Sequence, residues 1–300
     1  MSRAGALYCL ASAAGFGAMG VFGKLAYDEG VTVGTLLSTR FVLAAVVFWL
    51  ILVCARGGIR ELRSLTRRDL LIAIALGAVG YGAQAGAYFA ALDRLDASLL
   101  ALLVYTYPVL VAVAAIAIGR EPARRTTAVS LALASTGLVL VLAGAAAGAL
   151  DALGTALGLT AATVYTGYIL ISDGVTARVG PLALSTLVCT GAGVSLTLAG
   201  LAGGDLDPGA VTAEGYAWLA ALALVSTVGA VALFFAGLRR VGPTAASILS
   251  TVEPVVTVAL AFAVFGESLS PAQLTGGALV LAAVLTVRAP RKPELALSSP

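Results

Sequence analysis

The residue with the most chemical potential in this sequence is a glutamate inside an apolar stretch. Glu253 lies about ten residues into the stretch 243–265, which places it about 15 Å deep if that stretch is a helix. A carboxylate at that depth is costly unless it is protonated, paired or turned toward water. Glu253 is therefore predicted either to exchange a proton or bind a substrate ammonium group, or to hold the chain at Pro254 by a hydrogen bond or ion pair.

Two prolines mark places where backbone carbonyls are expected to lose their helical partners. Pro108 and Pro254 have no N–H, so they would free the carbonyl groups of Val104 and Ser250 near the middle of their apolar stretches. Freed carbonyls can bind cationic or polar substrate groups. The alternative is a kink that only serves packing, and the sequence leaves both open.

Only two basic residues lie within the apolar stretches, Lys24 and Arg40. Lys24 is close to one end of its stretch, where its stem can reach water, and it is the better candidate for binding a substrate carboxylate. Arg40 lies about 9 Å from the end of the next stretch. We predict that Arg40 pairs structurally with a carboxylate or with carbonyl groups at a helix C-terminus.

Tyrosines near the middle of apolar stretches are the remaining candidates for substrate binding. Tyr81, Gln84 and Tyr88 recur at the spacing of one helix face. The other members of this group are Tyr105, Tyr107, Tyr165 and Tyr168. A tyrosine hydroxyl far from the membrane interface needs a partner, which a hydrated cavity supplies. We therefore predict that these side chains line a substrate cavity.

Several function classes are excluded by what the sequence lacks. There is no histidine, which removes most zinc sites and histidine-based catalysis. Cys9, Cys54 and Cys189 each lie in an apolar run and are predicted to be small hydrophobic side chains. Glu253 has no accompanying nucleophile, and no phosphate-binding loop is present. We therefore predict that the protein is not an enzyme and that it binds no metal ion or cofactor. A net charge of +3 is too small to predict nucleic-acid binding.

The glycines at 15, 17 and 20 require a separate interpretation. The string from Gly15 to Gly20 matches a dinucleotide-binding fingerprint, but that motif needs a preceding strand and an acidic residue about 20 positions on. Here the string lies inside an apolar stretch, and position 40 is Arg. Close helix packing, or local flexibility at a substrate cavity, is the better explanation of these glycines.

The elements that position these residues are predicted to be transmembrane helices. Hydrophobic residues make up 60% of the chain and charged residues 11%, against about 45–50% and about 25% in globular proteins. The mean hydropathy is +1.03. The predicted helices cover 4–26, 34–55, 69–92, 97–118, 126–147, 152–172, 181–201, 214–238, 243–265 and 271–288. Ser270 and Gln273 form a capping box at the start of the last one.

The distribution of Lys and Arg predicts the orientation of these helices. If the N-terminus is cytoplasmic, fifteen Lys and Arg residues fall on the cytoplasmic side of the membrane and Arg94 alone falls on the other. The opposite loops are acidic, with residues such as Asp96, Asp151, Asp205 and Glu267. Both termini are therefore predicted to be cytoplasmic.

An internal repeat divides the chain into two halves of five helices. A shift of 146 residues aligns Arg94 with Arg240, Pro108 with Pro254 and Glu121 with Glu267. Because five is odd, the second half enters the membrane from the opposite side, as in many secondary transporters. We predict an all-α polytopic membrane protein with two inverted five-helix repeats, 1–148 and 149–289, and a cytoplasmic tail, 290–300.

The second half carries a pattern that resembles a known family. The Glu253-Pro254 pair, the Gly266-Glu267 pair and the Gly276-Gly277 pair follow one another as in the carboxy-terminal signature of EamA-domain proteins. The first half has the weaker copy, with Tyr107-Pro108 and then Glu121.

The resemblance covers about residues 5–288. Arg40 resembles the arginine that this family has in its second helix, whereas Phe16-Gly17 stands where the family often has Trp-Gly. The resemblance implies the drug/metabolite transporter superfamily, whose ten-helix members include exporters of amino acids and other small metabolites.

Taken together, the sequence predicts a secondary-active exporter of amino acids or related small polar metabolites that works by alternating access. It is expected in the bacterial inner membrane as a monomer or weak dimer, with a small polar substrate, the lipid bilayer and, as one alternative, protons as its partners. The competing hypotheses are a lipid-linked metabolite carrier or flippase, a channel and a membrane-embedded enzyme. A lipid-linked carrier would need a lateral opening and basic residues at the lipid headgroups.

Overall fold

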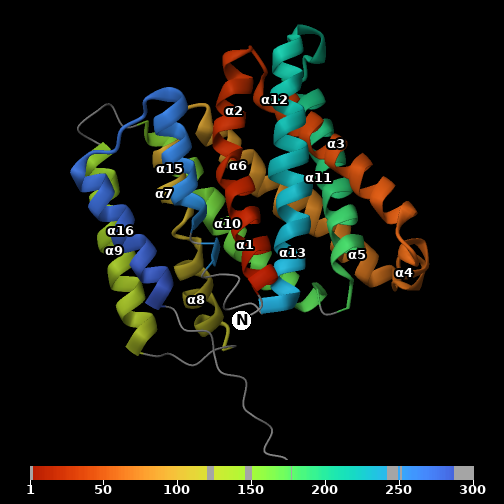
Figure 1. The fold of residues 1–300 in the computed structure, drawn as a ribbon, viewed down its shortest axis with the longest axis horizontal. Coiled ribbons are helices and arrows are strands. Elements are labelled where there is room, and N and C mark those ends of the chain that lie inside the picture. The colour runs from red at the N-terminus through yellow and green to blue at the C-terminus, as the bar shows by residue number, and fades with distance from the viewer. Residues whose placement is uncertain are drawn as a thin grey trace, which may run out of the picture.

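The protein is a bundle of helices whose axes run roughly along one direction (Figure 1). The structure is a computed structural model and describes residues 3–119, 125–145, 151–176, 178–241, 249–250 and 252–286. No β-strand occurs among these residues. An all-α fold agrees with the prediction from the sequence.

The first half of the chain contains one short helix between longer ones. Its elements are α1 (Arg3–Gly17), α2 (Met19–Asp28), α3 (Val33–Cys54), α4 (Gly58–Ser64), α5 (Arg67–Ala75), the π-helix η1 (Leu76–Tyr81), α6 (Gly82–Leu92), α7 (Ala97–Val104), α8 (Tyr107–Ala117) and α9 (Arg125–Ala145). The helices that follow directly on one another, such as α5, η1 and α6, form one continuous stretch.

The second half of the chain also contains only helical elements among the described residues. Its elements are α10 (Ala152–Thr176), α11 (Pro181–Gly203), the short 3-10 helix η2 (Pro208–Ala210), α12 (Ala213–Ala223), the π-helix η3 (Leu224–Gly229), α13 (Ala230–Val241), α15 (Val252–Phe265) and α16 (Pro271–Thr286). The first part of the predicted segment 243–265 lies outside the described residues up to position 248.

Local sequence signals explain where several helices begin. The Thr32, Thr66 and Thr212 hydroxyls accept hydrogen bonds from the first turns of α3, α5 and α12. At α16, Ser270 Oγ accepts from the Gln273 N–H, and Gln273 Oε1 accepts from the Ser270 N–H. The capping box predicted from the sequence is therefore confirmed.

The helices are long and apolar enough for a multi-pass membrane protein. Seven helical stretches of the described chain meet the length and hydropathy needed to cross a membrane. Shorter apolar helices occur at Leu131–Val141, Val252–Phe265 and Pro271–Ala283, within the fifth, ninth and tenth predicted segments. The number ten itself stays a prediction.

Helices of the first half pack mainly on helices of the second. The most extensive pairs are α9 with α16, α3 with α11, α1 with α13, and α6 with α10. The α9–α16 pair forms one edge of the bundle (Figure 1). Phe41, Phe48 and Phe89 are fully buried in the largest hydrophobic cluster. The core of the protein therefore lies where the halves meet.

Four predicted helices depart from regular α-helical geometry within their length. Helix α1 ends at Gly17 before α2 begins, and α7 ends at Val104 before α8 begins, with Pro108 as its second residue. The other two departures are the π-helices η1 and η3. A π-helical turn accommodates extra backbone at the cost of regular hydrogen bonding, and it is frequent at functional sites.

Candidate functional site

Helix α7, which precedes the proline-containing α8, contacts the proline-containing α15. The Tyr105 hydroxyl, between α7 and α8, donates a hydrogen bond to the Ser250 carbonyl oxygen just before α15. Pro254 is the third residue of α15 and removes the helical donor to that carbonyl, as the sequence predicted. The freed carbonyl is therefore occupied by Tyr105 in this structure rather than open to substrate.

The contact from Tyr105 to Ser250 predicts a measurable cost in stability. Tyr105→Phe leaves the buried carbonyl without its donor, so we expect the unfolding free energy to fall by about 1–3 kcal/mol. Thermal unfolding of the purified protein in detergent micelles measures this. Tyr168→Phe is the control, because among the described residues the Tyr168 hydroxyl makes no hydrogen bond. Equal unfolding temperatures for the two variants would contradict the role given to Tyr105.

Most of the predicted tyrosines form one chain of ring contacts across three stretches of helix. The centroid distances are 5.6 Å for Tyr105–Tyr107, 4.7 Å for Tyr107–Tyr165, 6.0 Å for Tyr165–Tyr168, 5.7 Å for Tyr168–Tyr81 and 5.1 Å for Tyr81–Phe41. Tyr105 is buried, whereas Tyr81, Tyr107, Tyr165 and Tyr168 keep part of their surface accessible. The tyrosines that were predicted to share a cavity thus lie together.

Gln84 and Tyr88 lie apart from this chain of rings. Both are buried on α6. The Tyr88 hydroxyl lies against α2, where a β-carbon at Gly20 would be 3.2 Å from it. The Tyr88 ring packs edge-on against Phe89 at 5.1 Å. The residues predicted to share one face of the helix 69–92 are therefore separated in the structure. Tyr81 contacts the chain of aromatic rings, and Tyr88 contacts α2.

Arg40 is the most deeply buried charged side chain, with 1% of its surface exposed. Its Nε donates a 2.8 Å hydrogen bond to Thr227 Oγ1. The guanidinium carbon lies 4.8 Å from the Phe41 ring centroid and 5.2 Å from the Phe89 ring centroid. We expected a carboxylate or helix C-terminal carbonyls as its partners; a hydroxyl and two aromatic rings take their place. Within the described part of the chain, Nη2 has no hydrogen-bond partner.

Thr227 was not singled out from the sequence, although it holds Arg40. It lies in the π-helix η3, and its hydroxyl also donates to the Leu222 carbonyl at 3.2 Å. The preceding Ser226 is fully buried, and its Oγ has no partner among the described residues. Two adjacent hydroxyl residues inside an apolar helix were the available signal.

Glu253 lies at the start of α15, next to the break in the first helix. A β-carbon at Gly17 would be 2.8 Å from the Glu253 carbonyl oxygen, so glycine lets the two backbones meet. The Thr257 hydroxyl donates to the Gly17 carbonyl at 2.9 Å. The packing interpretation of this glycine therefore fits the structure.

The Glu253 side chain is partly accessible and has no described hydrogen-bond or ion-pair partner. An ion pair that holds the kink at Pro254 is thus absent from the described residues. Tyr81 and Tyr88 lie within electrostatic range of both Glu253 and Arg40. Glu253 and Arg40 do not pair with each other in the described structure.

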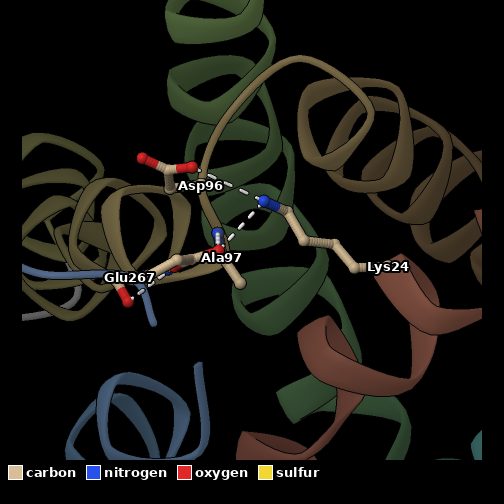
Figure 2. A network of polar contacts seen from close by, with 5 residues as sticks. Lys24, Asp96, Ala97 and Glu267 are labelled. Carbon is tan, nitrogen blue, oxygen red and sulfur yellow. Dashed lines mark hydrogen bonds and ion pairs between the residues drawn. The ribbon is translucent and has the colours of Figure 1, made fainter. Parts of the chain in front are cut away.

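Lys24, in α2, belongs to a different cluster, with Asp96, Ala97 and Glu267 around it (Figure 2). The cluster lies toward the end of the bundle where α2 ends (Figure 1). Its Nζ is 3.0 Å from Glu267 Oε1 and 3.6 Å from Asp96 Oδ1. Glu267 also accepts hydrogen bonds from the Ala97 and Ser98 N–H groups, at 3.1 and 3.0 Å, and from Ser98 Oγ at 2.8 Å. Lys24, predicted to bind a substrate carboxylate, is here bound by the protein's own carboxylates.

Other contacts tie loops together at this end, which we call the Lys24 end. Arg94 pairs with Asp151 at 3.2 Å, and the Gly34 N–H donates to Asp205 Oδ2 at 2.7 Å. The Thr212 hydroxyl donates to Glu29 at 2.6 Å. Loops of both halves are therefore connected around the Lys24 end.

The opposite end, which we call the α4 end, contains a hollow. Its volume is about 320 Å³. It is lined by Phe48, Glu61, Pro181, Leu182, Ser185, Ala232, Ala236 and Arg240, from α3, α4, α11 and α13. Helix α3, which carries Arg40, and α13, which directly follows η3, therefore both line this hollow.

A bundle of apolar helices with polar groups gathered inside and charges at its ends defines a multi-pass membrane protein. More narrowly, the chain belongs to the EamA-like transporter family, whose model matches residues 3–143 and 152–289. The uncharacterized transporter YcbK of Bacillus subtilis (strain 168) is 25% identical over 281 residues, which is 92% of this chain and 89% of that protein. A protein crystal structure with 18% identity has a TM-score of 0.67 and covers 95% of this chain and 96% of its own, which supports the fold.

Proposed function

We propose that the protein is a secondary-active transporter of amino acids or related small polar metabolites, and that it exports them by alternating access. The observation that carries the proposal is the partly accessible group of Tyr81, Tyr107, Tyr165, Tyr168 and Glu253. These polar side chains lie inside an apolar bundle of a transporter family, where burial without a ligand or water is costly.

The pairing of helices supports an inverted duplication. If α1–α9 and α10–α16 are exchanged, the pair α1–α13 becomes α10–α6, while α3–α11 and α9–α16 map onto themselves. The π-helices η1 and η3 begin 148 residues apart, close to the 146-residue shift that aligns the sequence. The family model also matches the chain in two parts. Such halves provide two related arrangements of the same contacts.

The two ends of the bundle support a state closed on one side. The Lys24 end is connected by several ion pairs and hydrogen bonds. The α4 end contains the hollow, and the halves are joined there by the ion pair of Arg178 with Asp69 at 2.8 Å. Because Arg residues concentrate near α4, we place that end in the cytoplasm, and both termini with it. A hollow at the cytoplasmic end is what an exporter needs where its substrate enters.

Counterflow in proteoliposomes tests the proposal. Vesicles loaded with an unlabelled compound should accumulate the same compound in labelled form, for at least one member of a panel of the common amino acids and related small polar metabolites. An imposed pH gradient should accelerate this transport, because a proton and a substrate ammonium group would compete for the Glu253 carboxylate. A protein that accumulates no member of the panel, or that conducts without saturation, contradicts the proposal.

The variant Glu253→Gln isolates the coupling step. We expect it to lose the acceleration by the pH gradient while it keeps residual exchange, since glutamine cannot bind and release a proton. Glu214→Gln is the matched control, because Glu214 is exposed in the first turn of α12. Full proton-dependent transport by Glu253→Gln would remove Glu253 from coupling.

A further inference from the structure

The unexplained feature of the centre of the bundle is the incomplete pairing of Arg40. A guanidinium group has five N–H donors and remains charged even when it is buried. Only Nε has a hydrogen bond with good geometry in the described structure, and Nη2 is buried without a partner. An unsatisfied donor on a buried cation is costly, so native proteins rarely keep one without a function.

The neighbours of Arg40 hold the guanidinium in place without neutralising it. The rings of Phe41 and Phe89 interact favourably with its positive charge, and Thr227 fixes Nε. The Tyr81 hydroxyl also interacts with the guanidinium. All of these neighbours are uncharged, so the positive charge remains available to an anion.

The site draws on both halves of the chain. Arg40 comes from α3, and Thr227 comes from the π-helix η3 beside the unpartnered Ser226 hydroxyl. A ligand held by Arg40 would therefore contact both halves, which is the position required of a substrate that controls alternating access.

The charged residues around Arg40 limit the chemical class of ligand that the site can bind. Tyr81 and Tyr88 are each near enough to both Glu253 and Arg40 for an electrostatic interaction, and Glu253 has no hydrogen-bond or ion-pair partner among the described residues. A planar carboxylate matches the fork of an arginine, and an ammonium group matches a carboxylate. A phosphate would place two negative charges near Glu253 with only Arg40 as a described, uncommitted interior cation, since Lys24 is paired with Glu267.

We propose that Arg40 binds the carboxylate of a zwitterionic substrate of the α-amino acid type, and that Glu253 receives its ammonium group. The inference rests on the proposed transport function and names the substrate class of that site. It also gives Arg40 and Lys24 the reverse of their predicted roles, with Arg40 in the site and Lys24 in a structural cluster.

Binding to the purified protein in detergent tests the inference independently of transport. Thermal stabilisation is measured with the common L-amino acids, and the amino acid with the largest shift is compared with its methyl ester and its 2-hydroxy acid. The ester lacks the carboxylate and the hydroxy acid lacks the ammonium group. We expect each to bind about 10- to 100-fold more weakly than the amino acid.

Substitutions at Arg40 and Thr227 assign the carboxylate contact. We expect Arg40→Lys to weaken amino-acid binding about 10- to 100-fold and to leave binding of the ester nearly unchanged, because only the amino acid uses the contact. Thr227→Val removes the hydroxyl that orients Nε and should reduce amino-acid binding in the same selective way. Arg94→Gln is the control, because Arg94 is half-exposed and pairs with Asp151 at the Lys24 end.

Three outcomes would overturn the inference. The first is a wild-type protein that no amino acid stabilises, even if counterflow finds another substrate and so upholds transport. The second is an Arg40→Lys protein that unfolds like the wild type and keeps full amino-acid affinity. The third is an equal loss of affinity for the amino acid and for its methyl ester in both Arg40→Lys and Thr227→Val. That result is expected if Arg40 only stabilises the fold.

Discussion

Replacing Gly77 with alanine is expected to reduce sharply the amount of folded protein in the membrane. Gly77 lies in η1, and a β-carbon there would be 2.0 Å from the Val188 carbonyl oxygen in α11. The contact is reciprocal, since a β-carbon at Gly191 would be 2.3 Å from the Ile74 carbonyl oxygen. Both obstacles are backbone atoms, so no side chain can rotate away to make room.

The cost of Gly77→Ala follows from this rigidity. Overpacking a core typically costs about 1–3 kcal/mol, and here two helices must separate, so the upper end of that range or more is expected. Membrane yield and the unfolding temperature in detergent measure the effect. Gly86→Ala in the adjoining α6 is the matched control, because no atom lies within 4 Å of its β-carbon position.

The control variant Gly86→Ala is itself expected to be as stable as the wild type. An added β-carbon at Gly86 favours the helix by about 0.5–1 kcal/mol, so this variant should be as stable as the wild type or slightly more stable. Equal yields of Gly77→Ala and Gly86→Ala would show that η1 and α11 are not in backbone contact.

The sequence predicted the ends of most helices because their signals are local. Pro181, the Ser270 capping box and the charged loops each act within a few residues of the chain, and the structure starts α11 and α16 at those places. The tyrosines were also singled out from the sequence, because a polar group far inside an apolar stretch is informative by itself. Their rings do contact one another, and their role in binding substrate stays a prediction.

The partners of the central residues could not be predicted in the same way. The contacts from Tyr105 to Ser250 and from Arg40 to Thr227 join residues 145 and 187 positions apart. Which side chains meet across the bundle depends on the rotation of each helix. The π-helices η1 and η3 change that rotation, and no residue pattern in the sequence indicated them.

Lys24 illustrates the same limit. The sequence showed that Lys24 lies near the end of an apolar stretch, and it showed that the loops on that side are acidic. It did not show that Lys24 contacts one of those acidic residues. Glu267 is 243 residues away in the sequence, and its contact with Lys24 depends on how α2, α7 and α15 are arranged. Whether a buried cation serves substrate or structure is decided by such a contact, not by the residue type.

Replacing Glu267 with glutamine is expected to destabilise the protein substantially at neutral pH. The Glu267 side chain is 8% exposed, and it accepts two backbone hydrogen bonds at the start of α7 as well as the Lys24 ion pair. Glutamine keeps an oxygen acceptor but loses the charge, which the positive N-terminus of the helix also favours. Removing one partner of a buried pair costs about 3–5 kcal/mol, and we expect the lower part of that range because Asp96 remains beside Lys24.

The same cluster predicts a dependence on pH. Burial by itself would raise the pKa of Glu267, but hydrogen bonds from Ser98 and Lys24 outweigh it and hold the pKa below its usual value. The carboxylate therefore stabilises the folded state above the ordinary glutamate pKa of about 4.3, and this contribution is lost as the pH falls through the lower folded-state value. The difference in unfolding free energy between the wild type and Glu267→Gln should be constant above about pH 5.5 and should become smaller in more acidic buffer.

Two further variants separate the ion pair from the helix cap. Lys24→Met leaves Glu267 with its donors from Ala97 and Ser98, so it should cost less than Glu267→Gln. Glu214→Gln, at an exposed position in the first turn of α12, should change stability by less than about 0.5 kcal/mol at any pH. If Glu267→Gln were no less stable than Glu214→Gln, or if its deficit did not shrink in acid, the cluster would not connect α2 to α7 energetically. The closed Lys24 end would then rest on the loop contacts of Asp205 and Asp151 alone.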